Sequence, residues 1–252
     1  MLVFAGLVPN SPLLMPGINT ARLSEAKETI HGLTELADDL YAAHPDIIVL
    51  LADCATSYPD AFSVNVADPY TADLSAVGDL DYKKTYHPDF GFVDSLQRFA
   101  RSNSIPISLS TDEQLTFASA VPLHYLTSHL KDVRIVPIAP TELDGKAHFA
   151  FGSTLQHLVM QSDKRIAVIA TGNMSHQPTP AEFDEKLLTF ITERNSSGLL
   201  QIDPDLILSA EDTSYRNICM LLGTLDGVDA TAHRLSYEKP FGVGYAVVNF
   251  AL

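Results

Sequence analysis

Residues 165–177 read RIAVIATGNMSHQ, and this stretch decides how the rest of the chain is interpreted. Ile166–Ala170 form an unbroken apolar run, which predicts a buried strand. Thr171-Gly172-Asn173 ends the run with residues that favour a turn. Ser175 and His176 follow the carboxyl end of that strand, where open α/β sheets bind their ligands. His176 is therefore a candidate acid–base group near neutral pH, although a loop histidine that caps its own turn has the same pattern.

Similar apolar runs alternate along the chain with amphipathic segments, an order that predicts parallel strands joined by right-handed crossovers. Strands are expected at 2–8, 47–52, 105–109, 133–138, 166–170 and 245–250, with an outlying strand at 61–66. Helices are expected at 23–40, 92–101, 143–160, 181–194 and 215–222, within 112–130, and after a cap at Asp203. The remainder of 56–91 is expected to be loop. The sequence thus predicts α/β class: a single three-layer αβα domain over residues 1–252 around a central, mostly parallel mixed sheet.

Composition limits the partners that the protein can have. Hydrophobic residues make up 46% of the chain, charged residues 19%, and the net charge is −15. Such an acidic chain repels phosphate backbones and anionic lipid, so neither nucleic acid nor a membrane is expected as a partner. Two cysteines, Cys54 and Cys219, are too few for a disulfide framework and fit a reducing compartment. The apolar amino terminus is interrupted by prolines, so it predicts a core strand and a cytoplasmic protein, not a signal peptide or a membrane helix.

Several segments match one family in the right order along nearly the whole chain. Residues 8–14, VPNSPLL, resemble the opening PHSPLL of the superfamily that unites the class III extradiol ring-cleaving dioxygenases with the Memo-like proteins, and most of all its AmmeMemoRadiSam system protein B-type members. The other matching segments are HPDIIV (44–49), PDAF (59–62), AVPL (120–123), ATGNMSH (170–176) and SYEKPFGVGY (236–245).

The resemblance implies a non-haem iron site whose ligand positions are substituted here. Active members hold Fe(II) with two histidines and one glutamate, which leaves coordination positions open for substrate and O₂. The histidine positions fall on Asn10 and Cys54, and the glutamate position falls on Asp212 by an ungapped alignment through Arg216. The acid–base histidine of the family is retained as His176. An amide oxygen and a soft thiolate are poor replacements for the two imidazoles, and Asp212 is one methylene shorter than glutamate.

The same resemblance suggests which other residues line the pocket. The Asp-His pair of the family's middle motif falls on Thr116 and Phe117, so a polar side chain is replaced by an apolar ring. The pocket residues expected from the family are Asp53, Thr116, Phe117, Ser175 and Glu238. For Glu238, capping of the last strand is an equal alternative.

Three functions remain open at this stage. The first is a catalytically inactive homologue or a non-catalytic subunit that binds no metal, pairs with a homologous catalytic chain or with its own copies, and takes a small aromatic or other small ligand. The second is a repurposed enzyme in which Cys54, His176, Asp212 and Asn10 hold Zn²⁺, or in which Cys54 and His176 act as nucleophile and base. The third is an active Fe(II) ring-cleaving dioxygenase with unusual ligands.

Overall fold

The structure is a computed structural model that describes residues 1–176, 178 and 181–252. Gln177, the last residue of the stretch quoted first, lies outside these ranges. The chain is organised around one eight-stranded sheet. In sheet order its strands are β10 (Thr231–Glu238), β11 (Tyr245–Ala251), β1 (Leu2–Val8), β9 (Ile166–Thr171), β2 (Ile47–Leu51), β8 (Arg134–Ala139), β3 (Phe62–Asn65) and β6 (Ile107–Ser110).

The sheet is mixed and mostly parallel, as predicted. The neighbours β1–β9, β9–β2, β2–β8 and β3–β6 pair parallel. The pairs β10–β11, β11–β1 and β8–β3 are antiparallel. The central strands β2 and β9 are buried along their whole length, which is why their sequences are continuous apolar runs without polar alternation.

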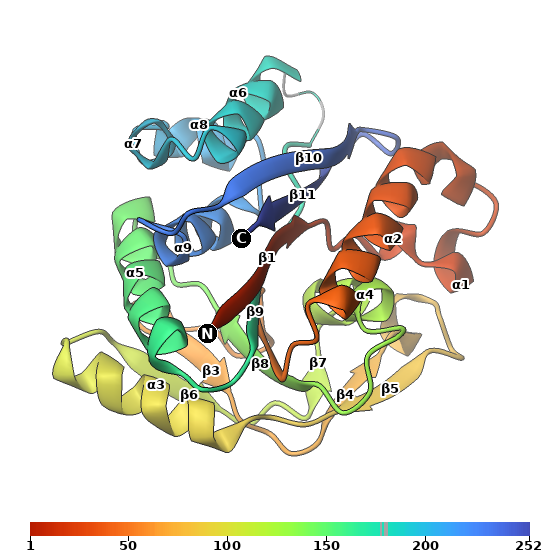
Figure 1. Cartoon of the computed structure of the whole chain (residues 1–252). Helices are drawn as coiled ribbons and strands as arrows, with labels where there is room; N and C mark the ends of the chain where they lie inside the picture. Colours follow the sequence, from red (N-terminus) through yellow and green to blue (C-terminus); the bar gives the residue numbers. More distant parts are fainter. Residues whose placement is uncertain (177, 179–180) are drawn as a thin grey trace.

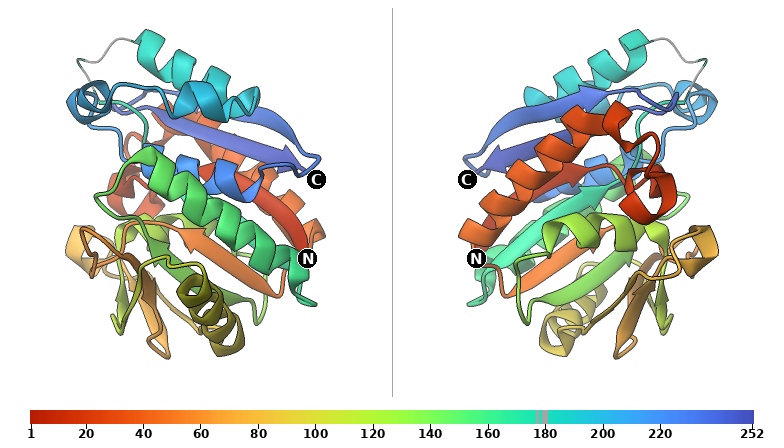
Figure 2. Two further views of the ribbon diagram at one scale, coloured as in Figure 1. Left: turned by 90° about the vertical axis from the view of Figure 1, so that its left-hand side faces the viewer. Right: turned by 90° about the vertical axis from the view of Figure 1, so that its right-hand side faces the viewer.

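Helices cover both faces of this sheet, giving the αβα layers seen in Figures 1 and 2. One face carries α2 (Lys27–Ala42) and α4 (Phe117–Leu126), preceded by the short elements η1 (Pro12–Leu14), α1 (Pro16–Asn19) and η2 (Leu23–Ala26). The other face carries α3 (Phe90–Ser102), α5 (Gly145–Gln161), α6 (Ala181–Thr192), α7 (Ser196–Leu199), α8 (Pro204–Ser209) and α9 (Tyr215–Thr224). None of the helices in the described ranges has the length and apolar character needed to span a membrane.

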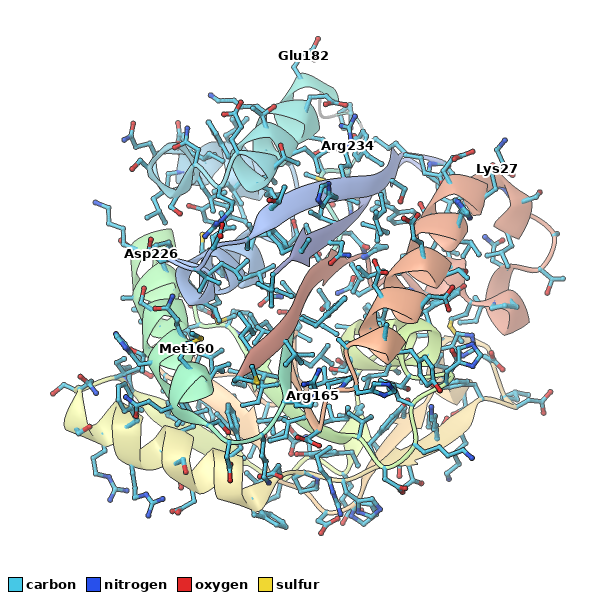
Figure 3. The ribbon with its side chains drawn as sticks, in the orientation of Figure 1. Lys27, Met160, Arg165, Glu182, Asp226 and Arg234 are labelled. Carbon is cyan, nitrogen blue, oxygen red and sulfur yellow. The ribbon has the colours of Figure 1, made fainter. Side chains whose placement is uncertain are left out.

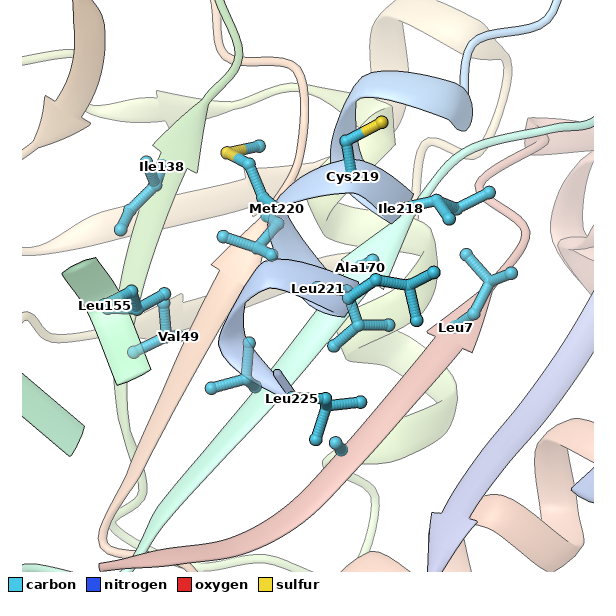
Figure 4. Packing of buried hydrophobic residues seen from close by; sticks show 14 of the residues in the cluster. Leu7, Val49, Ile138, Leu155, Ala170, Ile218, Cys219, Met220, Leu221 and Leu225 are labelled. Carbon is cyan, nitrogen blue, oxygen red and sulfur yellow. The ribbon is translucent and has the colours of Figure 1, made fainter. Parts of the chain in front are cut away.

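Helix α9 forms the centre of the core on its face of the sheet. Figure 4 shows Ile218 and Leu221 of α9 against Leu7 of β1 and Ala170 of β9. All four side chains are almost completely shielded from solvent. Burial of aliphatic side chains of this size contributes about 1.5–3 kcal/mol each, so α9 is a principal anchor of the fold.

Two regions differ from the sequence-based expectation. The strand predicted at 61–66 is not outlying, because β3 lies inside the main sheet between β8 and β6. Residues predicted as loop in 56–91 contribute β4 (Tyr70–Asp73), η3 (Ser75–Val77) and β5 (Lys83–Tyr86), and β4 and β5 form a small second sheet with β7 (Gln114–Leu115). The polar composition of these short strands hides them from a periodicity analysis.

Strand β10 is not among the strands expected from the sequence. It lies at an edge of the sheet and is largely polar along its length. Arg234 of β10 lies 3.1 Å from Glu185 of α6, and Figure 3 shows Arg234 on that edge strand. Charged side chains on an edge strand oppose pairing with another sheet. The polar residues that protect this edge from pairing are also the reason why a search for apolar runs does not find the strand.

Helices α5 and α9 cross closely enough that each needs a glycine at the contact. A Cβ atom on Gly152 of α5 would collide with the carbonyl oxygen of Met220, and one on Gly223 of α9 would collide with the carbonyl oxygen of Phe149. These backbones touch directly, so neither helix can accept a side chain at the crossing.

We expect Gly152→Ala to lower the free energy of unfolding by about 2 kcal/mol, because overpacking outweighs the better helix propensity of alanine. Gly91→Ala in α3 is the matched control, since its Cβ would meet only Asp89 Oδ1 at 3.4 Å. Urea unfolding of both variants measures the difference. Equal stability of the two variants would contradict a close α5–α9 crossing.

Candidate functional site

The residues singled out by the sequence lie at the edge of the sheet where the parallel strands end. Asn10 follows β1, Asp53 and Cys54 follow β2, and Ser175 and His176 follow β9. Because these three strands are parallel neighbours, their carboxyl ends meet at one edge. The structure therefore brings these candidate residues to the carboxyl edge of the sheet.

Hydrogen bonds fasten the loop after β9 to its neighbours. The Asn10 amide donates to Asn173 Oδ1 at 3.1 Å, and the Asn173 amide donates to Thr213 Oγ1 at 2.9 Å. The Thr213 amide donates back to the Asn173 carbonyl at 3.0 Å. Gly172 has a φ of 151°, and a Cβ there would lie 2.5 Å from Ser214 Cα. Glycine is required because the loop contacts the backbone of the turn before α9.

Asp212 lies in that turn and caps α9. Its Oδ1 atom accepts hydrogen bonds from the Ser214 amide at 2.7 Å, the Ser214 hydroxyl at 2.9 Å and the Tyr215 amide at 2.8 Å. Its Oδ2 atom is buried and has no hydrogen-bond partner among the described residues. Burial raises the pKa of Asp212 to about 6, against the opposing effect of the Ser214 and Tyr215 donors.

This pKa gives a testable pH dependence. A carboxyl group whose pKa is higher in the folded state favours folding while it is protonated, and it loses that contribution as pH rises from about 4 to about 6.5. We expect the stability of the wild type, relative to Asp212→Asn, to fall by about 2–3 kcal/mol over this range. Asparagine keeps the Oδ1 acceptor and removes the titration. A wild-type-minus-variant difference that does not change with pH in urea unfolding would contradict this environment.

Cys54 lies beyond β2 as a partly buried thiol. Its Sγ atom lies 3.6 Å from the Ala52 carbonyl oxygen. Burial, followed by the nearby charges of Asp53 and Asp112, raises the pKa of the thiol to about 12. A thiol with this pKa is protonated at neutral pH, so it is neither a ready nucleophile nor a ready metal ligand.

We expect the Cys54 thiol to react with iodoacetamide at pH 7.5 at least about 100-fold more slowly than an exposed cysteine, because little of it is thiolate. The measurement uses a Cys219→Ala background, so that one thiol remains. The same chain unfolded in urea is the control and is expected to react at the ordinary rate. Rapid alkylation of the folded chain would instead support a Cys–His function.

His176 has a carboxylate partner on one ring nitrogen. Its Nδ1 atom lies 3.2 Å from Glu211 Oε2, and its amide donates to the Ala210 carbonyl at 2.8 Å. Its Nε2 atom is buried and has no partner among the described residues. Glu211 adopts a left-handed backbone with a φ of 52°, which is uncommon outside glycine. The arrangement orients the imidazole ring while leaving Nε2 available for a proton.

Ser175 belongs to a buried polar network and does not face a cavity. Its hydroxyl accepts from Lys239 Nζ at 2.8 Å, and its amide donates to Asp184 Oδ1 at 3.0 Å. Asp184 is fully shielded and also accepts from the Tyr237 hydroxyl at 2.7 Å, with Lys239 Nζ 3.5 Å away. The network anchors α6 to the loop after β9.

The remaining predicted pocket residues have separate roles. The Thr116 hydroxyl donates to the Asp53 carbonyl at 2.6 Å, and Phe117 begins α4 with 43% of its surface exposed. Glu238 Oε1 accepts from the Thr29 amide at 2.6 Å. Glu238 therefore caps the first turn of α2 across the molecule, an interaction that differs from both roles expected for it.

A cleft of about 930 Å³ opens at this edge of the sheet. It is formed where α5, α8 and α9 begin and where β2 and β8 end. Of the residues predicted for the site, Asp53 and Asp212 line the part of the cleft formed by described residues. The predicted pocket between Asn10, Cys54, His176 and Asp212 thus corresponds only in part to the cleft that is present.

Comparison with known proteins identifies the family. A family model described as the catalytic LigB subunit of aromatic ring-opening dioxygenase matches residues 7–248. The chain belongs to this LigB family. Protein CA_C1420 of Clostridium acetobutylicum is 23% identical over 261 residues, which cover 96% of this chain and 56% of that protein. The chain therefore spans little more than half the length of this relative.

A solved structure shares the fold. The crystal structure of uncharacterized protein JW3007 from Escherichia coli K12 superimposes with a TM-score of 0.68 at 15% sequence identity. The match covers 98% of this chain and 99% of that one. The two proteins therefore share their fold over nearly the full length of both chains.

The site residues do not fit the ferrous ion that the LigB family implies. Fe(II) in such a site needs two neutral imidazoles and a free carboxylate. Here Asn10 and Cys54 occupy the two histidine positions suggested by the resemblance, and one oxygen of Asp212 is used by three donors. Across residues 1–176, 178 and 181–252, no three His, Cys, Asp or Glu side chains lie close enough together to hold a metal ion. The zinc site hypothesised from Cys54, His176 and Asp212 likewise does not correspond to any such cluster among these residues.

The sequence alone does not single out two basic residues of the cleft. Lys146 lies in the first turn of α5 and Arg216 in the first turn of α9. For Arg216 the sequence suggests only a contact that braces the Asp212 turn. The signal for both is their position, because the first turn of a helix after a parallel strand lies at the ligand-binding edge.

Proposed function

We propose that this chain is a LigB-family domain that has lost iron-dependent ring opening and works as a non-catalytic, ligand-binding homologue or companion subunit. The observation that carries the proposal is the chemistry of the residues at the histidine positions suggested by the resemblance, where this chain has the amide of Asn10 and the thiol of Cys54. Burial raises the pKa of that thiol to about 12. A neutral thiol donates no negative charge to a ferrous ion and binds it far more weakly than imidazole.

The condition of Asp212 supports the same conclusion. In an iron site the carboxylate must present an oxygen to the metal. Here Oδ1 is held by the Ser214 and Tyr215 donors, only the buried Oδ2 lacks a partner among the described residues, and burial raises the pKa of the carboxyl group to about 6. The carboxyl group thus serves α9 as a helix cap, worth about 1 kcal/mol for a typical cap.

Among the metal-ligand and acid–base positions suggested by the resemblance, His176 is the one that keeps its residue type. With Nδ1 beside Glu211 and a buried Nε2 that has no partner among the described residues, it supports hydrogen bonding to a bound molecule. Hydrogen bonding of this kind needs no metal. Retention of the histidine is therefore compatible with a small aromatic or other small ligand and with the loss of catalysis.

A companion role would require a second chain. We propose either a homologous catalytic subunit or further copies of this chain as the partner. Recovery of a LigB-family chain with intact histidine ligands on affinity purification would support the first form, and a homo-oligomer alone would support the second.

Oxygen consumption tests the loss of ring opening. We expect the protein, reconstituted anaerobically with Fe(II), to consume no O₂ above the free-iron control with protocatechuate or catechol. The double variant Asn10→His/Cys54→His is the matched comparison. Because it restores two imidazoles, we expect it to retain at least about tenfold more iron after desalting.

Wild-type turnover that is abolished by His176→Ala would contradict the proposal. It would instead establish an active dioxygenase with unusual ligands. Failure of the double variant to gain iron would show that Asn10 and Cys54 are not the equivalent positions, and would remove the argument from Cys54.

A further inference from the structure

The cleft at the carboxyl edge of the sheet has a built arrangement of charge. Three helices, α5, α8 and α9, begin at its wall, and each is capped by an aspartate: Asp144, Asp203 and Asp212. A capping carboxylate is offset by the partial positive charge of its helix terminus. These three acids are therefore used within the fold and do not define what the cleft binds.

Two cations in the cleft have no partner among the described residues. Arg216 and Lys146 lie in the first turns of α9 and α5, and both line the cavity. Across the described ranges, neither side chain forms a hydrogen bond or an ion pair. Two unpaired cations at one wall of a cleft favour an anionic group. Because guanidinium presents paired donors, Arg216 is suited to a carboxylate.

An unpaired carboxylate faces the same space. Asp53 lies at the end of β2 and also lines the cavity. Although the residue is exposed, desolvation by the surrounding protein raises the pKa of Asp53, and the charge of Arg216 partly opposes that rise. The described residues contain no ion pair between the two side chains, so both remain available to a molecule in the cavity.

The wall beside these charges is apolar. Leu200 and Ile202 contribute to the cavity from the segment after α7, and Ile207 contributes from α8. Small-molecule sites typically combine such an apolar surface with a few convergent polar groups and enclose about 300–1,000 Å³. The cleft has both features and a volume of about 930 Å³.

We propose that this cleft binds an amphoteric ligand, an amino acid or short peptide with an apolar side chain, whose carboxylate contacts Arg216 and Lys146 and whose ammonium group contacts Asp53. The inference rests on the proposed function in treating the cleft as a binding site that needs no metal. The apolar side chain of the ligand lies against Leu200, Ile202 and Ile207.

Isothermal titration calorimetry in EDTA tests this with L-leucine, L-phenylalanine and the dipeptide L-Leu-L-Phe. We expect at least one to bind, and 3-phenylpropionate and phenethylamine, each lacking one charge, to bind about tenfold more weakly or worse. Arg216→Gln and Asp53→Asn are each expected to weaken the charged probe about tenfold. In Asp53→Asn the probes with and without an amine should become equivalent. Comparison of the amino acids with the dipeptide distinguishes the two ligand sizes.

Matched controls exist on α3. Asp94 and Arg98 form an exposed pair 3.0 Å apart on α3, outside the cleft. Asp94→Asn and Arg98→Gln change the net charge equally and should leave binding unchanged, and thermal unfolding checks that all variants fold. The inference would be overturned if no probe binds at about 10 mM. It would also be overturned if the Asp53→Asn and Arg216→Gln variants bind the probes as tightly as the wild type. Either result leaves the oxygen-consumption test of the proposed function unaffected.

Discussion

The reciprocal hydrogen bonding between Asn173 and Thr213 is the contact on which the carboxyl edge of the sheet depends. Each residue donates its amide to an oxygen of the other, at 2.9 and 3.0 Å, and the Asn173 side chain also accepts from the Asn10 amide. These bonds join the loops after β1 and β9 to the turn before α9. They add to the strand pairing of β1 with β9, and they hold the turn before α9 against that edge.

The same turn bears on the proposed change of the family's site. Asp212 Oδ1 is held by the amides that start α9, and only the buried Oδ2 lacks a partner among the described residues. Burial and the nearby charges of Asp53 and Asp112 raise the pKa of the Cys54 thiol. On our proposal, the LigB fold persists because its core and loop connections do not require the metal.

Much of the fold could be predicted because buried parallel strands have an unmistakable composition. The apolar runs of β2 and β9 identify themselves, and their shared direction places Asp53 and His176 at one edge. The small second sheet and β10 could not be found in this way, because their exposed strands are polar or short. Their existence depends on partners that are remote in the sequence.

The sequence could predict which candidate residues lie at the strand ends, but not the contacts of their side chains. Motif order could not show that Glu238 accepts a hydrogen bond from the Thr29 amide. It also could not show that Ser175 is enclosed with Lys239. Side-chain direction and long-range partners decide these cases, and neither is present in a local pattern. Arg216 illustrates the reverse, because its importance follows from the cleft that surrounds it.

The central claim is that the edge of this LigB-family sheet no longer holds iron. A crystal structure of the protein soaked anaerobically with Fe(II), with anomalous data collected on both sides of the iron absorption edge, tests it most directly. The account predicts no iron-specific peak among Asn10, Cys54, His176 and Asp212, with Asp212 still hydrogen-bonded to the amides of α9. A strong iron peak coordinated by those side chains would contradict it.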